Sequence, residues 1–141
     1  MRLAFIGATG LTVKTAHALI DEGHEVVIIE RDEERIKELG EQLDCAFLHG
    51  DGSTPDVLKE VDPTRTHILY CITNHDQTNI IAGLIGKNLG IPRVVVMIED
   101  EGFLPICEQL GLHDTIVPVR TVSRHLAGLA KAEEQEVKAD K

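Results

Sequence analysis

The sequence is poor in the residues that build disulfide frameworks and metal sites. It has three cysteines and seven histidines among 141 residues. The cysteines, Cys45, Cys71 and Cys107, are too few and too scattered for a disulfide framework or a Cx2C metal site. The histidines are spread singly, without the i, i+4 pairing of a zinc-binding helix. We therefore expect no metal site, and we expect Cys45 and Cys71 to be small core residues in a reducing compartment.

Long apolar runs and an excess of positive charge are also missing. No run approaches the ~20 apolar residues that a membrane-spanning helix needs. The net charge of −10 argues against nucleic acid or an anionic membrane as a direct partner. A protein partner that sits in a membrane stays compatible with this charge. The first residues pass straight into a strand pattern, so we expect no signal peptide, no direct membrane insertion and a cytoplasmic location.

The most informative part of the sequence is its first thirty residues. Residues 2–6 form a short apolar run, residues 7–12 a turn that contains glycine, residues 13–22 a helical pattern and residues 25–29 a β-branched run that ends at Glu30. This order is typical of a dinucleotide-binding βαβ unit, in which phosphates bind at the helix N-terminus. Glu30 stands about where an acid accepts hydrogen bonds from ribose hydroxyls.

The glycine positions depart from the G-x-G-x-x-G fingerprint. Positions 7, 9 and 12 hold Gly, Thr and Thr, whereas positions 7, 10 and 13 hold Gly, Gly and Val. A side chain at Thr9 would stand where the backbone approaches the pyrophosphate, and Thr12 would widen the packing of the helix on the strand. Two alternatives remain: the hydroxyls of Thr9 and Thr12 bond phosphate oxygens, or the chain is a Rossmann-like scaffold that has lost its ligand.

Strand and helix patterns alternate along the rest of the chain. Strands are predicted at residues 45–49, 66–72, 93–98 and 115–119, and helices at residues 33–43, 55–61, 76–89, 103–110 and 120–130. This pattern predicts an α/β protein with a three-layer, doubly wound Rossmann-like fold and a six-stranded, mainly parallel sheet. We expect one domain over residues 1–130 and a charged, frayed tail over residues 131–141. Gly83 and Gly86, inside a predicted helix, indicate either a close backbone contact or a weak helix.

A ligand of this fold binds outside the carboxyl ends of the strands. The candidate cofactor-binding residues there are Gly7, Ala8, Thr9, Gly10, Leu11, Thr12, Glu30, Arg31, Asp51, Gly52, Thr73 and Asn74. Glu30 would repel a 2′-phosphate, while Arg31 keeps an NADP-type ligand open as the less favoured alternative.

Catalytic groups are few. The only tyrosine, Tyr70, has Asn74 rather than lysine four residues later, and the sequence has neither a G-x-S-x-G elbow nor a P-loop. We therefore expect a nucleotide to act as a signal rather than as a reagent, and no enzyme.

A series of short motifs resembles one known family, the RCK (regulator of K⁺ conductance) or TrkA-N family. This family provides the Rossmann-type N-terminal domain of Trk/Ktr-type regulators of potassium channels and transporters. The motifs are Gly7-Ala8, residues 23–27, residues 30–35, residues 49–52, Thr73 with Asp76 and Asn79, residues 89–92, Leu110-Gly111 and Val117-Pro118, and together they span about residues 1–130.

The resemblance implies a cytosolic regulatory subunit that binds NAD(H) or an adenine nucleotide (ATP, ADP or AMP) and gates a membrane-embedded potassium channel or transporter. By position, the loop from Gly7 would hold phosphates and Glu30 the ribose. Asp51 with Gly52 would lie near the adenine, and Thr73 with Asn74 would line the other side. Two alternatives remain open: a small NAD(P)-dependent oxidoreductase, or a regulatory scaffold of another cation exchanger that binds no nucleotide.

The sequence departs from the family pattern in two places. The family loop commonly has arginine where this chain has Gly10, and the usual C-terminal subdomain is expected to be absent. In the family, the helix after the sixth strand commonly crosses to a second subunit. Here the stripe Val119, Val122, Leu126 and Leu129 implies either the same contact in a homodimer or a helix that folds back on its own sheet.

Overall fold

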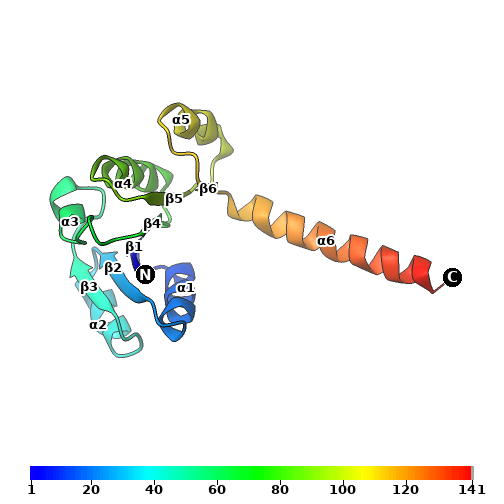
Figure 1. Ribbon diagram of the computed structural model, residues 1–141, viewed down its shortest axis with the longest axis horizontal. Coiled ribbons are helices and arrows are strands. Elements are labelled where there is room, and N and C mark those ends of the chain that lie inside the picture. Colours follow the sequence, from blue (N-terminus) through cyan, green and yellow to red (C-terminus); the bar gives the residue numbers. More distant parts are fainter. Residues whose placement is uncertain (141) are drawn as a thin grey trace.

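The computed structural model describes residues 1–140 and is built around one six-stranded sheet (Figure 1). All strands are parallel, in the order β3-β2-β1-β4-β5-β6. They are β1 (Arg2–Ile6), β2 (Glu25–Glu30), β3 (Ala46–His49), β4 (Ile68–Cys71), β5 (Arg93–Met97) and β6 (Thr115–Ile116). The helices are α1 (Gly10–Asp21), α2 (Glu33–Gly40), α3 (Pro55–Lys59), α4 (Asp76–Asn88), η1 (Glu101–Phe103), α5 (Leu104–Gln109) and α6 (Pro118–Ala139). The predicted Rossmann-like fold is confirmed, with a sheet that is parallel throughout.

The sheet separates two apolar cores. Successive residues of a strand point to opposite faces, so every central strand contributes to both cores. One core packs the sheet against α3, α4 and α5, and includes Ala4, Ile6, Val27, Ile29, Leu58, Leu69, Ile80 and Cys107. The other packs it against α1 and α2, and includes Leu3, Phe5, Ala16, Val26, Ile28 and Leu39. Because the strands are buried on both faces, they consist of the nearly continuous apolar runs seen in the sequence.

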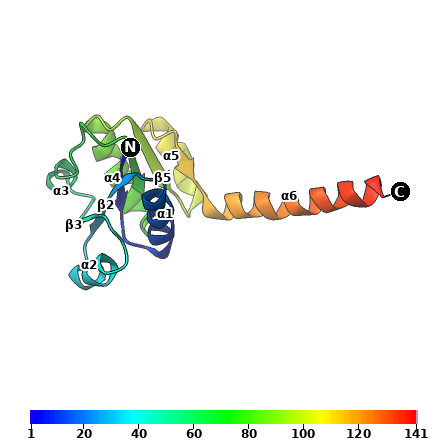
Figure 2. The same ribbon diagram turned by 60° about the horizontal axis from the view of Figure 1, so that its bottom comes forward.

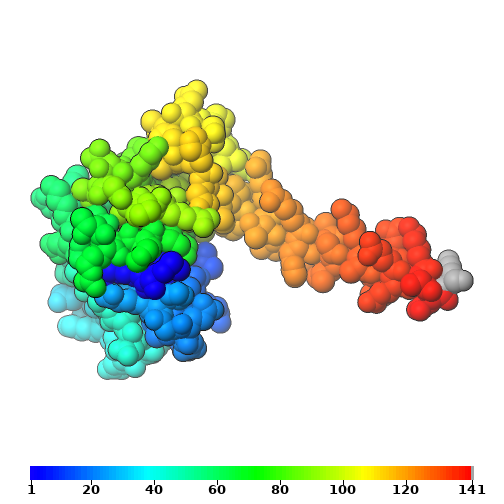
Figure 3. Space-filling model, in the orientation of Figure 1, coloured from blue at the N-terminus to red at the C-terminus, as the bar shows by residue number. Residues whose placement is uncertain are grey.

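Within residues 1–140, no helix lies over one face of the sheet at β4 to β6. On the side of α1 and α2, a groove of about 280 Å³ lies over β4, β5 and β6. Its apolar lining is Leu11, Ile68, Tyr70, Ile72, Val95, Met97 and Ile116. The helix that follows β6 does not fold back over this groove: α6 projects away from the domain and has no buried residue (Figures 2 and 3). On this face of the sheet, the helical layer therefore consists of α1 and α2 and leaves β4, β5 and β6 uncovered.

The end of the chain differs from the sequence prediction. The last strand stops at Ile116 rather than at residue 119, because Pro118 already occupies the first turn of α6. The predicted frayed tail is wrong for the described residues, since α6 continues across residue 130 as one helix to Ala139. Alanine, glutamate, glutamine and lysine dominate this part, and all favour helix. Lys138 also pairs with Glu134 one turn earlier, at 3.0 Å.

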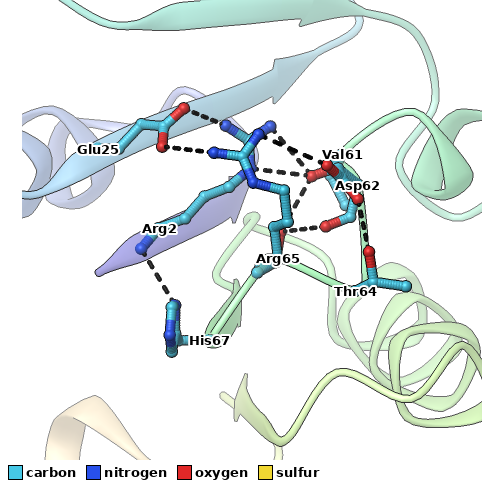
Figure 4. Close-up of polar contacts among 8 residues, drawn as sticks. Arg2, Glu25, Val61, Asp62, Thr64, Arg65 and His67 are labelled. Atoms are coloured by element: carbon cyan, nitrogen blue, oxygen red, sulfur yellow. Dashed lines mark hydrogen bonds and ion pairs between the residues drawn. The ribbon is translucent and has the colours of Figure 1, made fainter.

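A polar network closes the amino edge of the sheet (Figure 4). The Arg2 side chain, at the start of β1, pairs with Glu25 at the start of β2. Its Nε and Nη2 both donate to the Val61 carbonyl, at 3.2 and 3.0 Å. Arg65 reaches the same Glu25 carboxylate at 3.9 Å. These contacts tie β1 and β2 to the segment that leads into β4, at the edge opposite the strand carboxyl ends.

Both glycines inside α4 face the sheet at close range. A Cβ at Gly83 would lie 2.7 Å from a methyl carbon of Val96, and a Cβ at Gly86 would lie 2.4 Å from one of Leu69. Val96 and Leu69 have no exposed surface. The interpretation that these glycines allow a close contact between α4 and the sheet is therefore confirmed.

We expect Gly83→Ala to destabilise the domain although alanine favours helix. The added methyl group overlaps Val96, a stiff β-branched side chain in a full core, and such overpacking costs about 1–3 kcal/mol. Gly40→Ala in α2 is the matched control, because a Cβ there has no neighbour within 4 Å. It should gain about 0.5–1 kcal/mol. Urea unfolding at an unchanged m-value measures both, and equal midpoints for the two variants would contradict the packing argument.

Candidate functional site

A cleft of about 310 Å³ lies at the carboxyl ends of β1, β2, β3 and β4. It lies where the strand order reverses between β1 and β4, which is where open parallel sheets bind ligands. The sequence-predicted residues that line it are Gly7, Ala8, Thr9, Glu30, Arg31, Asp51, Gly52, Thr73 and Asn74. Gly10, Leu11 and Thr12 do not line it. The structure adds Ile6, Ile29, Asp32, Arg35, Gly50, His75 and Thr78.

The turn from β1 into α1 presents free backbone donors. Gly7 has φ +92°, a conformation that side chains other than glycine rarely adopt. Thr9 caps α1 by accepting the Thr12 N–H at 3.3 Å. Within the described chain, the N–H groups of Thr9, Gly10 and Leu11 have no hydrogen-bond partner. The first turn of α1 carries no acidic residue. This helix end therefore suits an anion such as a phosphate.

The two threonines of this turn act differently from the prediction. The side chain of Thr12 has no exposed surface, and its hydroxyl lies 3.3 Å from that of Thr9. The predicted contact of the Thr12 hydroxyl with a phosphate is therefore wrong. The Thr9 hydroxyl is engaged in the cap, and Thr9 also lines the cleft. Leu11 points away from the cleft and lines the groove over β4 to β6.

Glu30 lies at the end of β2 beside this turn. One carboxylate oxygen accepts the Ala8 N–H and the other accepts the Asp32 N–H, both at 3.0 Å. These bonds fix the orientation of the carboxylate in the cleft. A carboxylate has about four acceptor positions, so Glu30 can accept further hydrogen bonds from ligand hydroxyls.

Arg35 is a cleft residue to which sequence reasoning gave no separate role. Its Nε donates to the Ala8 carbonyl at 3.1 Å, and its Nη1 pairs with Glu38 at 3.2 Å. With Arg31 it brings guanidinium charge to a cleft that also contains acids. A signal was available in the sequence: Asp32 is the N-cap of α2, and a long side chain three residues later can reach back to the carboxyl end of β2.

The turn after β3 closes the cleft on the opposite side from Thr73. The Ser53 hydroxyl and backbone N–H both donate to Asp51, at 2.6 and 2.9 Å, and hold the pKa of the Asp51 carboxyl below its usual range. Asp51 is therefore ionised at neutral pH. A Cβ at Gly52 would lie 2.6 Å from Ile6, so this turn packs directly on the end of β1.

The described residues support neither a metal site nor a reactive cysteine. Over residues 1–140, no three His, Cys, Asp or Glu side chains gather as a metal-binding group would. Burial raises the pKa of all three cysteine thiols, to about 11 for Cys45. Among the same residues no helix has the length and the apolar character to cross a membrane.

Comparison with known proteins finds a matching family model and relatives among the Trk system potassium uptake proteins. The family model of the TrkA-N domain matches residues 3–118. The Trk system potassium uptake protein TrkA homolog of Methanothermobacter thermautotrophicus is 25% identical over 123 residues, which are 87% of this chain and 56% of that protein. The TrkA homolog of Archaeoglobus fulgidus is 29% identical over 133 residues, or 92% of this chain and 30% of that protein. The chain thus spans about half or less of these relatives.

Solved structures share the fold at low sequence identity. The NAD(P)-binding domain of an exopolyphosphatase-related protein from Archaeoglobus fulgidus has a TM-score of 0.82 at 14% identity, with 92% and 97% of the two chains covered. The GsuK channel bound to NAD has a TM-score of 0.74 at 15% identity, with 83% of this chain and 21% of that chain covered. The AMP-bound form of the Shewanella denitrificans Kef CTD has a TM-score of 0.76 at 13% identity, with 94% of this chain and 80% of that chain covered. With the family match over most of its length, this chain belongs to the TrkA-N domain family.

Proposed function

We propose that this chain is the nucleotide-sensing part of a regulator of a membrane potassium channel or transporter. One observation carries the proposal: unpaired N–H groups at the start of α1 lie beside the Glu30 carboxylate in the cleft at the switch point of the sheet. Donors for phosphate next to an acceptor for ribose hydroxyls are what a nucleotide requires. The names of the TrkA relatives support the potassium part of the proposal.

The ligand is NAD(H) or an adenine nucleotide, ATP, ADP or AMP. Its phosphates lie on the turn from Gly7 and at the N-terminus of α1, and its ribose hydroxyls donate to Glu30. Asp51 and Gly52 flank the adenine, and Thr73 with Asn74 line the other side of the cleft. The NAD-bound GsuK channel and the AMP-bound Kef CTD support this choice of ligands, because both proteins contain a domain of the same fold. We assign the nucleotide the role of a signal, with no chemical step.

The chain acts as a homodimer on the cytoplasmic side of its membrane partner. The stripe Val119, Val122, Leu126 and Leu129 on α6 is more than half exposed. The same chain leaves an apolar groove over β4 to β6, where a helix after β6 would complete the layer. The α6 of a second copy fits this groove, and each copy then covers the apolar surface of the other. The exposed stripe and the uncovered groove on the same chain support a dimer rather than a docking site for an unrelated protein.

We expect at least one nucleotide to raise the melting temperature of the purified chain by about 5–10 °C when present at a hundred times its Kd. The panel is NAD⁺, NADH, NADPH, ATP, ADP and AMP. Glu30→Ala should abolish the ligand-induced shift, because it removes the acceptor for the ribose hydroxyls. Glu33→Ala is the matched control: it removes the same charge from an exposed position three residues away, and should keep the shift.

Flat curves for all six nucleotides, or a full shift in Glu30→Ala, would contradict the sensing role. Oxidation of NADH by the chain in the presence of a carbonyl compound as hydride acceptor, seen as a fall in absorbance, would favour a small oxidoreductase instead. The potassium part of the proposal has its own readout, rubidium uptake by cells that carry each variant. Uptake with Glu30→Ala should differ from wild type, whereas uptake with Glu33→Ala should not.

A further inference from the structure

The segment after β4 belongs to two cavities. Thr73 and Asn74 line the nucleotide cleft, and they also line a cavity of about 190 Å³ beside the first turn of α6. The second cavity includes Val117 and Pro118, where α6 begins. One short loop is therefore a wall of the ligand site on one side and a neighbour of the projecting helix on the other.

This loop is held by a buried amide. Asn79, in α4, has no exposed surface, and its side chain makes four hydrogen bonds. Its Oδ1 accepts the Thr73 N–H at 2.9 Å and the Thr73 hydroxyl at 2.6 Å. Its Nδ2 donates to the Thr73 carbonyl at 3.1 Å and to the Met97 carbonyl at 2.9 Å. Asn79 thus ties the cleft wall to the end of β5.

The first residue of α4 ties the same wall to the loop after β5. The two carboxylate oxygens of Asp76 accept the N–H groups of Glu99 and Asp100, each at 2.9 Å. A shift of the first turn of α4 therefore moves the loop after β5, because the carboxylate binds two successive backbone N–H groups.

The loop after β5 in turn holds α6. Arg120 in the first turn of α6 pairs with Glu101 in η1. Within residues 1–140 this is the only side-chain ion pair or hydrogen bond between α6 and the segment before Val117. Both partners are about half exposed, so the ion pair contributes little stability. A change in the orientation of α6 therefore costs little free energy.

We propose that the first turn of α4, through Asp76 and Asn79, couples the nucleotide cleft to the base of α6. Thr73 lies so close to the phosphate turn that a Cβ at Gly7 would be 2.8 Å from its methyl carbon. A phosphate on that turn therefore acts on Thr73, and Asn79 and Asp76 pass the change to the loop that holds Arg120. This inference rests on the proposed function, since it needs a nucleotide in the cleft.

Hydrogen exchange on the full chain tests this coupling at saturating concentration of the nucleotide that gives the largest melting shift. In wild type, the ligand should slow amide exchange over residues 7–12 and over residues 117–123. We expect at least about fivefold at the second segment, the lower end of coupling between two sites. In Asp76→Ala the first segment should keep its protection, which reports a folded and liganded cleft, and the second should lose it.

Two further variants sharpen the test. Asp56→Ala removes an exposed carboxylate from the first turn of α3 and should keep protection at both segments. Glu101→Ala removes the acceptor of the Arg120 side chain, the last contact before α6, and should lose protection at residues 117–123 only. Equal protection of that segment in wild type and Asp76→Ala would overturn the coupling. So would a protected phosphate turn with no change at α6 in wild type, although the proposed function would then stand. If neither segment responds, both proposals fail.

Discussion

Asn79→Leu is expected to lower the free energy of unfolding by about 3 kcal/mol or more. Leucine has a similar size but cannot form the hydrogen bonds of the buried amide. The Thr73 hydroxyl keeps the His75 carbonyl as a partner at 3.2 Å. The N–H and carbonyl of Thr73 and the carbonyl of Met97 lose theirs. These three groups are partly buried, and each of them left unpaired costs about 1 kcal/mol, the lower end of the usual range. A loss of this size is a large part of the about 5–15 kcal/mol that typically stabilises a domain.

The same change at Asn88 provides the control. Asn88 is exposed in the last turn of α4, so Asn88→Leu should change stability by less than about 0.5 kcal/mol. Chemical unfolding followed by circular dichroism gives both values. If the two variants unfold at the same denaturant concentration, the amide of Asn79 is not what holds the wall of the cleft.

Most of the fold and of the cleft could be predicted from the sequence because the signals are local. The β-branched run of residues 25–29, the helical periods between the strands and the positive φ implied by Gly7 each depend on a few neighbouring residues. Once the sheet is parallel, the carboxyl ends of its strands share one edge. Glu30, Asp51 and Thr73 therefore meet in one cleft although they lie far apart in the sequence.

The misplaced residues depend on how α1 is rotated. The helix starts at Gly10, so successive residues point about 100° apart and only some can face the cleft. Thr12 turns into the core and Leu11 turns toward the groove over β4. The glycine fingerprint assigns residues by spacing and carries no information about this rotation. Two threonines take the place of two glycines: the Thr9 hydroxyl caps the helix, and it also contacts the Thr12 hydroxyl.

Arg35 and Asn79 escaped a functional assignment for a different reason. Each acts through a partner distant in the sequence: Arg35 through the Ala8 carbonyl, and Asn79 through the Met97 carbonyl. A lone arginine on a charged helix, or an asparagine on an apolar one, has no periodic signature of its own. The length of α6 does not follow from the sequence because a high density of charge also predicts disorder. The residues that carry the charge are also good helix formers.

The second large effect concerns α6. Leu126→Asp should convert the proposed dimer into a monomer by weakening association at least about a thousandfold. Burying a leucine contributes about 1.5–3 kcal/mol, and a symmetric dimer loses this contribution twice. A total of about 4 kcal/mol corresponds to roughly three powers of ten in Kd. The introduced carboxylates add a desolvation cost in the same direction. Analytical ultracentrifugation over a range of concentrations measures the dissociation constant.

Two matched variants separate the proposed exchange of α6 from other arrangements. Ala127→Asp adds the same charge at the next residue, which lies off the stripe of Val119, Val122, Leu126 and Leu129, and should leave the dimer intact. Ile116→Asp changes the groove rather than the helix, and should weaken the dimer as Leu126→Asp does. A dimer that resists Ile116→Asp but not Leu126→Asp would pair its helices without entering the groove. A wild-type chain that stays monomeric at every concentration would contradict the dimer. In that case α6 would cover its own sheet or bind a different protein.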